Sequence, residues 1–159
     1  MRIYWINELD SDQIGMMPRP RGNDWLFDEI LALKNYGVDA DISLLEFHEI
    51  DELELNGEGR LCEENGIEYI NHPIKDRGVP KSKTAFIALV GELIVMLENN
   101  KKVVTHCRMG IGRTSLLAAA ILKQLKPNQA YIFKSLTEIR TLAVPDTQAQ
   151  KDWVLHSFL

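Results

Sequence analysis

The nine residues HCRMGIGRT, at positions 106–114, place one cysteine among residue types that bind anions. Gly110 and Gly112 allow the backbone to curl so that several amide N–H groups point inward, and such a nest before a helix binds a tetrahedral oxyanion. The guanidinium of Arg113 adds planar donors that grip two phosphate oxygens. We therefore interpret Cys107 as a reactive thiol at the base of a phosphate-binding loop.

The alternative for a lone cysteine is a small buried hydrophobe, which is the commoner role of a free thiol. The spacing of two glycines and an arginine after Cys107 argues against that alternative. Amide N–H groups at a helix N-terminus and a nearby cation stabilise a thiolate, which is the nucleophilic form of cysteine. The donors that would bind phosphate would thus also activate Cys107.

The composition is that of an ordinary folded protein, with 159 residues, of which 45% are hydrophobic and 26% are charged. This length predicts a single domain over residues 1–159. The formal net charge of −5 argues against nucleic-acid or acidic-membrane partners, so a bound anion needs a local positive pocket.

The cysteines and histidines show no metal-binding spacing, because Cys62 and Cys107 stand apart and no histidine clusters with both. We expect neither a metal nor another cofactor. The first ten residues lack the charged start and apolar run of a signal peptide. The most apolar helical stretch, residues 86–97, is short and carries Glu92, so we expect no membrane span. We therefore expect a protein of the reducing cytoplasm, with a monomer favoured.

Strands alternate with helices along the chain. Short β-branched or apolar runs predict strands at residues 2–6, 41–45, 68–74 and 101–106. Helical spacing of apolar residues predicts helices at residues 24–37, twice within 48–65, and at 83–100, 114–125, 128–142 and 146–158. The expected helix caps are Asn23 or Asp24, Asn128 and Asp146. Residues 15–23, GMMPRPRGN, are expected to form a loop.

This alternation predicts an α/β fold with a central, mostly parallel sheet of about four to five strands and helices on both faces. Ligands bind such sheets beyond the carboxyl ends of the strands. Residues 106–114 lie at such a place, between strand 101–106 and the helix that follows.

HCRMGIGRT matches every fixed position of H-C-x-x-G-x-G-R-[ST], and on these residues the chain resembles the cysteine-based protein tyrosine phosphatase superfamily. HPIKDRGVP, residues 72–80, is similar to the general-acid loop of its compact archaeal and bacterial members and of their dual-specificity relatives. VPDTQAQ, residues 144–150, is similar to a late segment whose glutamine faces the site. The resemblance covers most of the chain and implies the same α/β fold.

The resemblance implies roles for individual residues. Cys107 would attack phosphorus and form a phosphocysteine, and Asp76 would protonate the leaving oxygen and then activate water. Thr114 would donate its hydroxyl to the departing thiolate, and His106 would hold the loop through hydrogen bonds. The equatorial phosphate oxygens would contact the residues of the loop, which are Arg108, Met109, Gly110, Ile111, Gly112 and Arg113.

Three nearby residues have two open interpretations each. Arg77 stands where close relatives often have glycine, and it either weakens Asp76 as an acid or binds a substrate anion. Glu46 follows a strand, where it either orients Arg113 or lies as a carboxylate at the rim of the pocket. Gln150 either positions water or is a polar residue of the last helix.

Four further residues have structural interpretations. Cys62 is expected to be a plain helix cysteine, with a reversible disulfide to Cys107 as the alternative. Arg19 and Arg21 either solubilise the surface or attract phosphate at the rim of the pocket. His72 is expected to pack beside the acid loop.

The favoured function is a protein tyrosine or dual-specificity phosphatase. Two alternatives stay open, a phosphatase of inositol phosphates or phosphoinositides and a catalytically inactive phosphate-binding module. Loops for highly charged substrates carry several basic residues, whereas only Arg108 is basic among the variable positions here. Inactive relatives lose the cysteine, the arginine or the acid, and Cys107, Arg113 and Asp76 are all present. An arsenate-reducing enzyme would need more resolving cysteines than Cys62.

Overall fold

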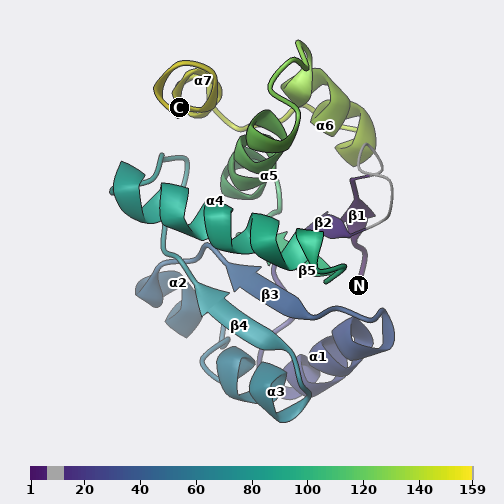
Figure 1. The fold of residues 1–159 in the computed structure, drawn as a ribbon. Helices are drawn as coiled ribbons and strands as arrows, with labels where there is room; N and C mark the ends of the chain where they lie inside the picture. Colours follow the sequence, from purple (N-terminus) through teal and green to yellow (C-terminus); the bar gives the residue numbers. More distant parts are fainter. Residues whose placement is uncertain (7–12, 159) are drawn as a thin grey trace.

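The chain folds around a five-stranded sheet (Figure 1). The computed structural model describes residues 1–6 and 13–158. The strands are β1 (Tyr4–Trp5), β2 (Ile14–Met17), β3 (Ala40–Ser43), β4 (Glu68–Asn71) and β5 (Val103–His106). They lie in the order β1-β2-β5-β3-β4, with β1 antiparallel to β2 and every other neighbouring pair parallel. The predicted mostly parallel α/β sheet is confirmed.

Strand β2 corrects the prediction of a loop over residues 15–23. All four of its residues are buried, and it pairs in parallel with β5, so that Met17 lies opposite His106. The prolines and arginines that favour a loop begin at Pro18, one residue after the strand ends. A strand that is buried on both faces has no alternation of polar and apolar residues, so its sequence pattern is weak.

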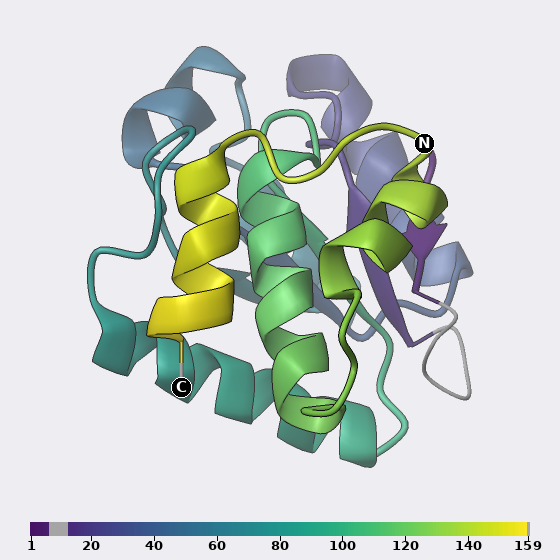
Figure 2. The ribbon, with the colours of Figure 1, turned by 90° about the horizontal axis from the view of Figure 1, so that it is seen from above.

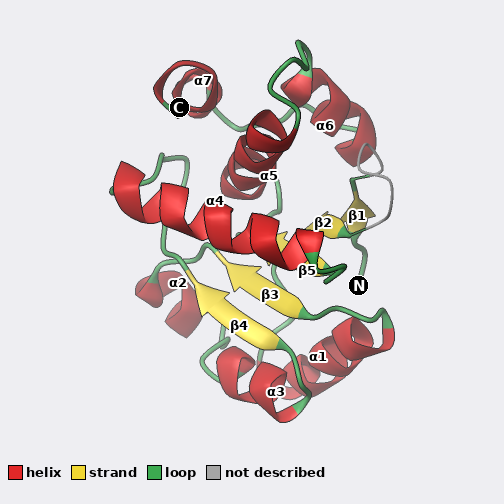
Figure 3. Ribbon diagram, in the orientation of Figure 1, coloured by secondary structure: helices red, strands yellow, loops and turns green. Residues whose placement is uncertain are grey.

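Helices cover both faces of the sheet, as Figure 2 shows from above and Figure 3 shows by element type. One face carries α4 (Lys83–Glu98), α5 (Gly112–Leu125), α6 (Ile132–Arg140) and α7 (Gln148–Asp152), which continues into a π-helical turn, η2 (Trp153–Ser157). The opposite face carries α1 (Leu26–Asn35), which follows a 3₁₀ turn, η1 (Asn23–Trp25), together with α2 (Phe47–Glu52) and α3 (Glu58–Glu64). The turn η1 follows Gly22 without a side-chain cap, contrary to the prediction for Asn23 or Asp24.

The side chains of β5 divide between two apolar clusters, one on each face of the sheet. Val103 packs in the cluster that includes α4 to α7, and Val104 packs in the cluster of α1 to α3. This is the two-residue alternation of a strand that is covered on both sides. Helix α5 packs deeply into the first cluster, and every residue from 112 to 122 is buried. The position of the helix that follows the candidate loop is therefore fixed by the core.

Two further helix caps differ from the predicted ones. Helix α6 begins after Tyr131, so Asn128 is not its cap. Helix α7 is capped by Thr147, whose hydroxyl accepts from the backbone N–H of Gln150 while the Gln150 side chain returns a contact to the cap. Asp146 is therefore left outside the helix, contrary to its predicted role as the cap.

The carboxyl ends of the four parallel strands, β2 to β5, lie at the same edge of the sheet. The loops that follow Met17, Ser43, Asn71 and His106 therefore gather there, as expected for a ligand site of such a sheet. Within the described ranges, no helix has the length and apolarity needed to cross a membrane.

Candidate functional site

Residues 107–111 form the loop between β5 and α5, and the carbonyl oxygen of each of them contacts a donor group outside the loop. Nδ1 of His106 lies 3.3 Å from the carbonyl oxygen of Cys107, and the backbone N–H of Arg19 donates to that of Arg108 at 3.2 Å. Arg140 donates from Nη2 to the carbonyl oxygen of Met109 at 3.2 Å and from Nε to that of Gly110 at 3.1 Å. The hydroxyl of Ser115 donates to the carbonyl oxygen of Ile111. In a trans peptide the N–H points away from the C=O. The amides of residues 108–112 therefore point to the opposite side, which is the geometry of an anion nest.

The two glycines of the loop are required by the space around them. Gly110 has a φ of +71°, and a Cβ there would lie 2.5 Å from the carbonyl carbon and oxygen of Met17. A Cβ on Gly112 would collide with the carboxylate of Asp146 and approach the side chain of Gln150. The loop thus lies directly on the end of β2 and beneath the segment that leads into α7.

The thiol of Cys107 lies at the base of this loop, where only 3% of the residue is exposed. The hydroxyl of Thr114 donates to Sγ of Cys107 at 3.0 Å, so a thiolate there would have a hydrogen-bond donor. A cavity of about 200 Å³ opens at this point. Its lining residues are Asp76, Arg77, Cys107, Arg108, Met109, Gly112, Arg113 and Asp146.

The guanidinium of Arg113 is buried and held by Glu49. Nη1 donates to Oε2 of Glu49 at 2.6 Å, and Nη2 donates to Oε1 at 2.8 Å. Nη1 also donates to the carbonyl oxygen of Ile74 at 2.9 Å. Burial raises the pKa of Glu49, but the hydrogen bonds from Arg113 and the backbone outweigh burial and lower it to about 2. The guanidinium is therefore fixed in orientation before any ligand binds.

Glu46 does not orient Arg113, which corrects one of its two predicted roles. It is the N-cap residue of α2, and its backbone N–H donates to Oε2 of Glu49 at 2.9 Å. The carboxylate that reaches Arg113 thus comes from one helical turn further along the chain. The Glu46 side chain is one-third exposed and lies 3.9 Å from His48, and its interpretation as a rim carboxylate stays a prediction.

Asp76 lies at the mouth of the cavity, in a turn that follows β4. Its Oδ1 is 3.3 Å from Nη2 of Arg113, and about half of its side chain is exposed. The next residue, Arg77, has a φ of +61°, a left-handed conformation that favours glycine. This conformation gives a physical reason why glycine suits position 77. Asp76 and Cys107 line the same cavity.

Gln150 is fully buried and connects α7 to the turn that carries Asp76. Its Nε2 donates to the carbonyl oxygen of Gly78 at 3.0 Å, and its Oε1 accepts from the backbone N–H of Thr147 at 3.2 Å. The side chain therefore supports residues 76–78 from behind. Asp146, which precedes Thr147 in the chain, lines the cavity itself.

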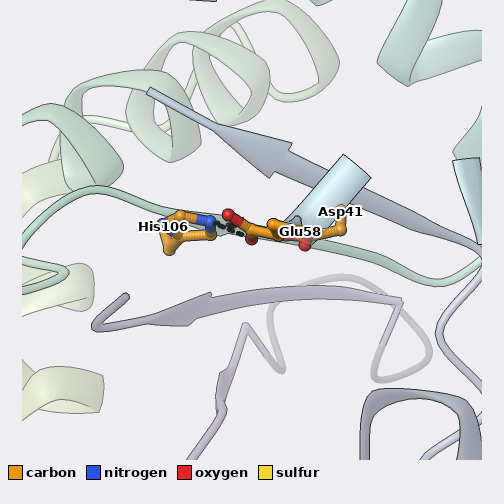
Figure 4. Close-up of side chains that lie close together, drawn as sticks. All are labelled: Asp41, Glu58 and His106. Carbon is orange, nitrogen blue, oxygen red and sulfur yellow. Dashed lines mark hydrogen bonds and ion pairs between the residues drawn. The ribbon is translucent and has the colours of Figure 1, made fainter. Parts of the chain in front are cut away.

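A buried cluster of titratable side chains lies behind the loop of residues 107–111 (Figure 4). Nε2 of His106 is 2.6 Å from Oε1 of Glu58 and 3.8 Å from Oδ1 of Asp41. Burial raises the pKa of Glu58 to about 7 and that of Asp41 well above its ordinary value. Burial also lowers the pKa of His106. All three effects favour uncharged groups in this cluster.

The pKa of Glu58 predicts an unusual dependence of stability on pH. Since the folded state binds this proton more tightly than the unfolded state, the contribution of Glu58 to stability is largest below pH 4.5 and is lost as the pH rises through about 7. Glu58→Gln should remove this loss and be more stable than the wild type at pH 8, by on the order of 3 kcal/mol. Urea unfolding from pH 4.5 to 8 measures the difference.

The control for this measurement is Glu63→Gln, which changes an exposed glutamate on the same helix and should follow the wild-type profile. The raised pKa of Asp41 acts in the same direction as that of Glu58, whereas the lowered pKa of Glu49 reduces stability only below pH 4.5. A Glu58→Gln profile that is parallel to the wild type between pH 4.5 and 7 would contradict the assignment.

Several candidate residues lie away from the cavity. Arg21 pairs with Glu29 at 2.7 Å, and Arg19 contributes its backbone N–H to the loop. His72 is half-buried beside Phe86, with ring centroids 6.0 Å apart. Cys62 is a free thiol in the apolar cluster of α1 to α3, whereas Cys107 belongs to the other cluster, so the structure gives no support to a disulfide between them.

A family model described as "Polymorphic toxin system, DSP-PTPase phosphatase" matches residues 14–125, which is more than half of the chain. The chain belongs to the DSP-PTPase phosphatases. The cysteine-based tyrosine phosphatase superfamily predicted from HCRMGIGRT is thereby confirmed.

Known proteins similar to this DSP-PTPase include two mammalian ones. The "Cyclin-dependent kinase inhibitor 3" of Mus musculus is 30% identical over 129 residues, covering 79% of this chain and 59% of the mouse protein. The protein of the same name from Rattus norvegicus is 35% identical over 102 residues, covering 62% of this chain and 46% of the rat protein. The chain thus spans about half the length of these curated relatives.

Among solved structures, kinase associated phosphatase with its catalytic cysteine replaced by serine has a TM-score of 0.89 to this DSP-PTPase. The match covers 99% of this chain and 93% of the other at 24% identity. A structure of PTPMT1 has a TM-score of 0.75, with coverage of 92% and 89% at 18% identity. At these identities the likeness concerns the fold alone, and it agrees with the five-stranded sheet described above.

The site of this DSP-PTPase contains residues that the sequence motifs did not reveal. Glu49 holds Arg113, Arg140 holds two carbonyls of the loop, and Glu58 contacts His106. Arg140 follows Ile132 and Leu136 at helical spacing, so an arginine on the apolar face of a helix was the available signal. For Glu49 and Glu58 the corresponding signal is an acidic residue on the buried face of a helix.

Proposed function

We propose that this chain is a phosphomonoester hydrolase of the tyrosine or dual-specificity type, which acts on phosphorylated proteins through a phosphocysteine intermediate. The observation that carries this proposal is the position of Sγ of Cys107 at the base of the nest of residues 107–112, in the cavity that Arg113 also lines. A phosphate group in that cavity would meet inward amides, a fixed guanidinium and a nucleophile together.

In the first step, the thiolate of Cys107 attacks phosphorus, and the bond between phosphorus and the leaving oxygen breaks. The carboxylic acid of Asp76 gives its proton to that oxygen, which leaves as an alcohol or phenol. The amides of residues 108–112 and the guanidinium of Arg113 hold the equatorial oxygens. These donors are already in place, because their orientation is set by the outer contacts of the loop and by Glu49.

In the second step, the carboxylate of Asp76 takes a proton from water, whose oxygen attacks phosphorus and breaks the P–S bond. The electron pair returns to sulfur, and the hydroxyl of Thr114, 3.0 Å from Sγ, stabilises the thiolate that forms. Inorganic phosphate leaves and the thiolate is regenerated. Gln150 acts as a support of the acid turn, through its hydrogen bond to Gly78.

The charges around the cavity support a monoester on a protein rather than a polyphosphorylated small molecule. The guanidinium of Arg108 is engaged by Glu49 at 3.4 Å and by Glu52 at 3.3 Å. Asp76 and Asp146 add negative charge to the lining. Met109 is exposed at the cavity and offers an apolar contact to an aromatic ring such as that of phosphotyrosine.

A substrate panel tests this proposal. Initial rates on phosphotyrosine, phosphoserine and phosphothreonine peptides and on inositol phosphates are compared, with Cys107→Ser as the control. The expected result is faster hydrolysis of the phosphopeptides. Faster hydrolysis of the inositol phosphates would favour the alternative substrate class, and no hydrolysis of any compound would favour a phosphate-binding module.

We also propose that residues 1–159 form a single phosphatase domain that works in a reducing compartment such as the cytoplasm. The site draws on segments from the end of β2 to α7, so the phosphatase unit needs most of the chain. A thiol nucleophile stays reduced in such a compartment.

Arg140 should be important for turnover although it lies outside the cavity lining. Arg140→Met removes the donors to the carbonyls of Met109 and Gly110, so the inward amides lose their fixed direction. We expect kcat/KM for p-nitrophenyl phosphate to fall roughly tenfold to a hundredfold. Lys134→Met, an exposed change on the same helix, is the control and should keep the wild-type value. Equal kinetics of the two folded variants would contradict this role.

A further inference from the structure

A row of fully buried polar side chains lies behind the loop of residues 107–111, with Glu58 between His106 and Asp41 (Figure 4). They come from α3, β5 and β3 respectively. Cys62, also on α3, extends the row, because its Sγ lies 3.5 Å from Oδ2 of Asp41. The two carboxyl groups have no part in the mechanism given above, so their cost of burial calls for an explanation.

The contacts of His106 restrict where the protons lie. The carbonyl oxygen of Cys107 can only accept, so Nδ1 of His106, 3.3 Å away, carries a hydrogen. Nε2 is 2.6 Å from Oε1 of Glu58, so one proton lies between them. Either a carboxylic acid donates to a neutral imidazole, or an imidazolium donates to a carboxylate. Full burial favours the neutral pair.

The second carboxyl group supports the same assignment. Oδ1 of Asp41 and Oε2 of Glu58 are buried and have no hydrogen-bond donor among the residues that the structure describes. The two carboxyl groups are nevertheless close enough to hydrogen-bond to each other. A proton on Asp41 satisfies both oxygens at once. The donors then run in one direction, from Cys62 through Asp41 and Glu58 to His106 and the loop.

The spacing does not fit a metal ion held between these groups. Tetrahedral zinc keeps nitrogen and oxygen ligands at about 2.0–2.2 Å, which places two ligand atoms about 3.3 Å apart. Nε2 of His106 and Oε1 of Glu58 are 2.6 Å apart, which is a hydrogen-bond distance.

We propose that Glu58, backed by Asp41, is a positioning residue that donates a proton to Nε2 of His106 and so fixes the tautomer whose Nδ1–H holds the carbonyl of Cys107. Its effect on turnover rests on the proposed function. With that carbonyl held outward, the rigid peptide directs the N–H of Arg108 into the cavity. When Glu58 loses its proton, Nε2 carries the hydrogen instead, and Nδ1 turns a lone pair toward the carbonyl.

The other titratable groups around this row do not change charge between pH 6 and 8.5. Burial raises the pKa values of Cys62 and Tyr69 further above neutrality, so both stay protonated. Glu63 is exposed beside Cys62. The charges of Arg113 and Arg19 lower the pKa of His106 further. A change of the His106 tautomer or of turnover in this pH range therefore reports the titration of Asp41, Glu58 or His106.

The tautomer can be measured directly on the full chain. Two-bond ¹H–¹⁵N spectra of ¹⁵N-histidine-labelled protein distinguish Nδ1–H, Nε2–H and imidazolium. The wild type is expected to show Nδ1–H on His106 at pH 6 and Nε2–H at pH 8.5. Glu58→Gln, whose amide N–H donates at every pH, is expected to show Nδ1–H at both. Glu63→Gln should follow the wild type. The His106 signal is isolated in a background in which the other histidines are replaced by glutamine, namely His48, His72 and His156.

Turnover gives the second readout. At pH 6 the kcat of Glu58→Gln should stay within about twofold of the wild type, and at pH 8.5 it should exceed the wild type by about threefold. An imidazolium or an Nε2–H tautomer at pH 6, or a Glu58→Gln variant that follows the wild type at pH 8.5, would overturn the proposal, as would one bound zinc ion per chain. A chain without hydrolysis would contradict the proposed function, whereas the tautomers would still decide this inference.

Discussion

Cys107→Ser is expected to lower kcat for p-nitrophenyl phosphate by at least about a thousandfold while the folded protein still binds inorganic phosphate. Serine has nearly the shape of cysteine, but its hydroxyl stays protonated where a thiol becomes a thiolate. The phosphate donors come from the loop amides and Arg113, and neither depends on the sulfur. Steady-state kinetics and calorimetric titration with phosphate measure the two halves of the prediction.

Alkylation gives an independent test of the activated thiol. We expect iodoacetate at pH 6 to modify Cys107 and spare Cys62, and phosphate to protect Cys107, because the same cavity holds anion and nucleophile. Cys62 is the internal control, since it is fully buried and its thiol pKa is raised by burial. Mass spectrometry locates the modification. Alkylation without phosphate protection, or a serine variant that keeps its turnover, would count against the nucleophile.

The parts of the fold that were predictable are those with strong local patterns. Strand β5 and the helices α4 and α5 show continuous apolar runs with clear ends, and the structure places them close to the predicted ranges. Strand β2 was not predictable in the same way, because Ile14–Met17 is short and one of its two partners, β5, is almost ninety residues away. Only its pairing with β1 and β5 makes residues of this type a strand.

The residues of the candidate site also divide into those predicted by a local pattern and those determined by tertiary contacts. Cys107, Gly110 and Arg113 lie close together in the sequence, in the loop and the first turn of α5, so their spacing alone predicted an anion nest. One of the two interpretations of Glu46 made it the partner of Arg113, but the partner is Glu49, one helical turn later. Both are acids just after β3, and only the capping geometry of α2 decides which one turns inward.

The supports of the loop come from distant parts of the chain. Arg140 lies 30 residues from Gly110 of the loop, and Glu58 lies 48 residues from His106 at the end of β5; no short motif includes either of them. Each lies on the buried face of a helix, where a charged residue needs a partner. A charged residue on an apolar helix face can be recognised in the sequence, but the residue that pairs with it is determined only when the helices pack.

Asp76→Asn is expected to reduce turnover according to the leaving group. For a phosphopeptide, whose phenol or alcohol needs a proton to leave, kcat should fall roughly a hundredfold. For p-nitrophenyl phosphate, whose leaving group is stable as an anion, the fall should be much smaller in the first step. Asparagine keeps the size of the side chain and its place beside Arg113, so the loss reports the proton and not the fold. Rates measured across a series of aryl phosphates give the slope that separates the two cases.

Asp146→Asn is the matched control, because Asp146 is the second carboxyl group that, with Asp76, lines this cavity. The carboxylate of Asp146 lies against Gly112, so Asp146→Asn is expected to affect substrate binding. The rate should then change by a similar factor for good and poor leaving groups. If Asp146→Asn showed the steep dependence on the leaving group and Asp76→Asn did not, the proton donor would be Asp146. The acid would then come from the segment before α7, and the turn after β4 would serve to bind the substrate.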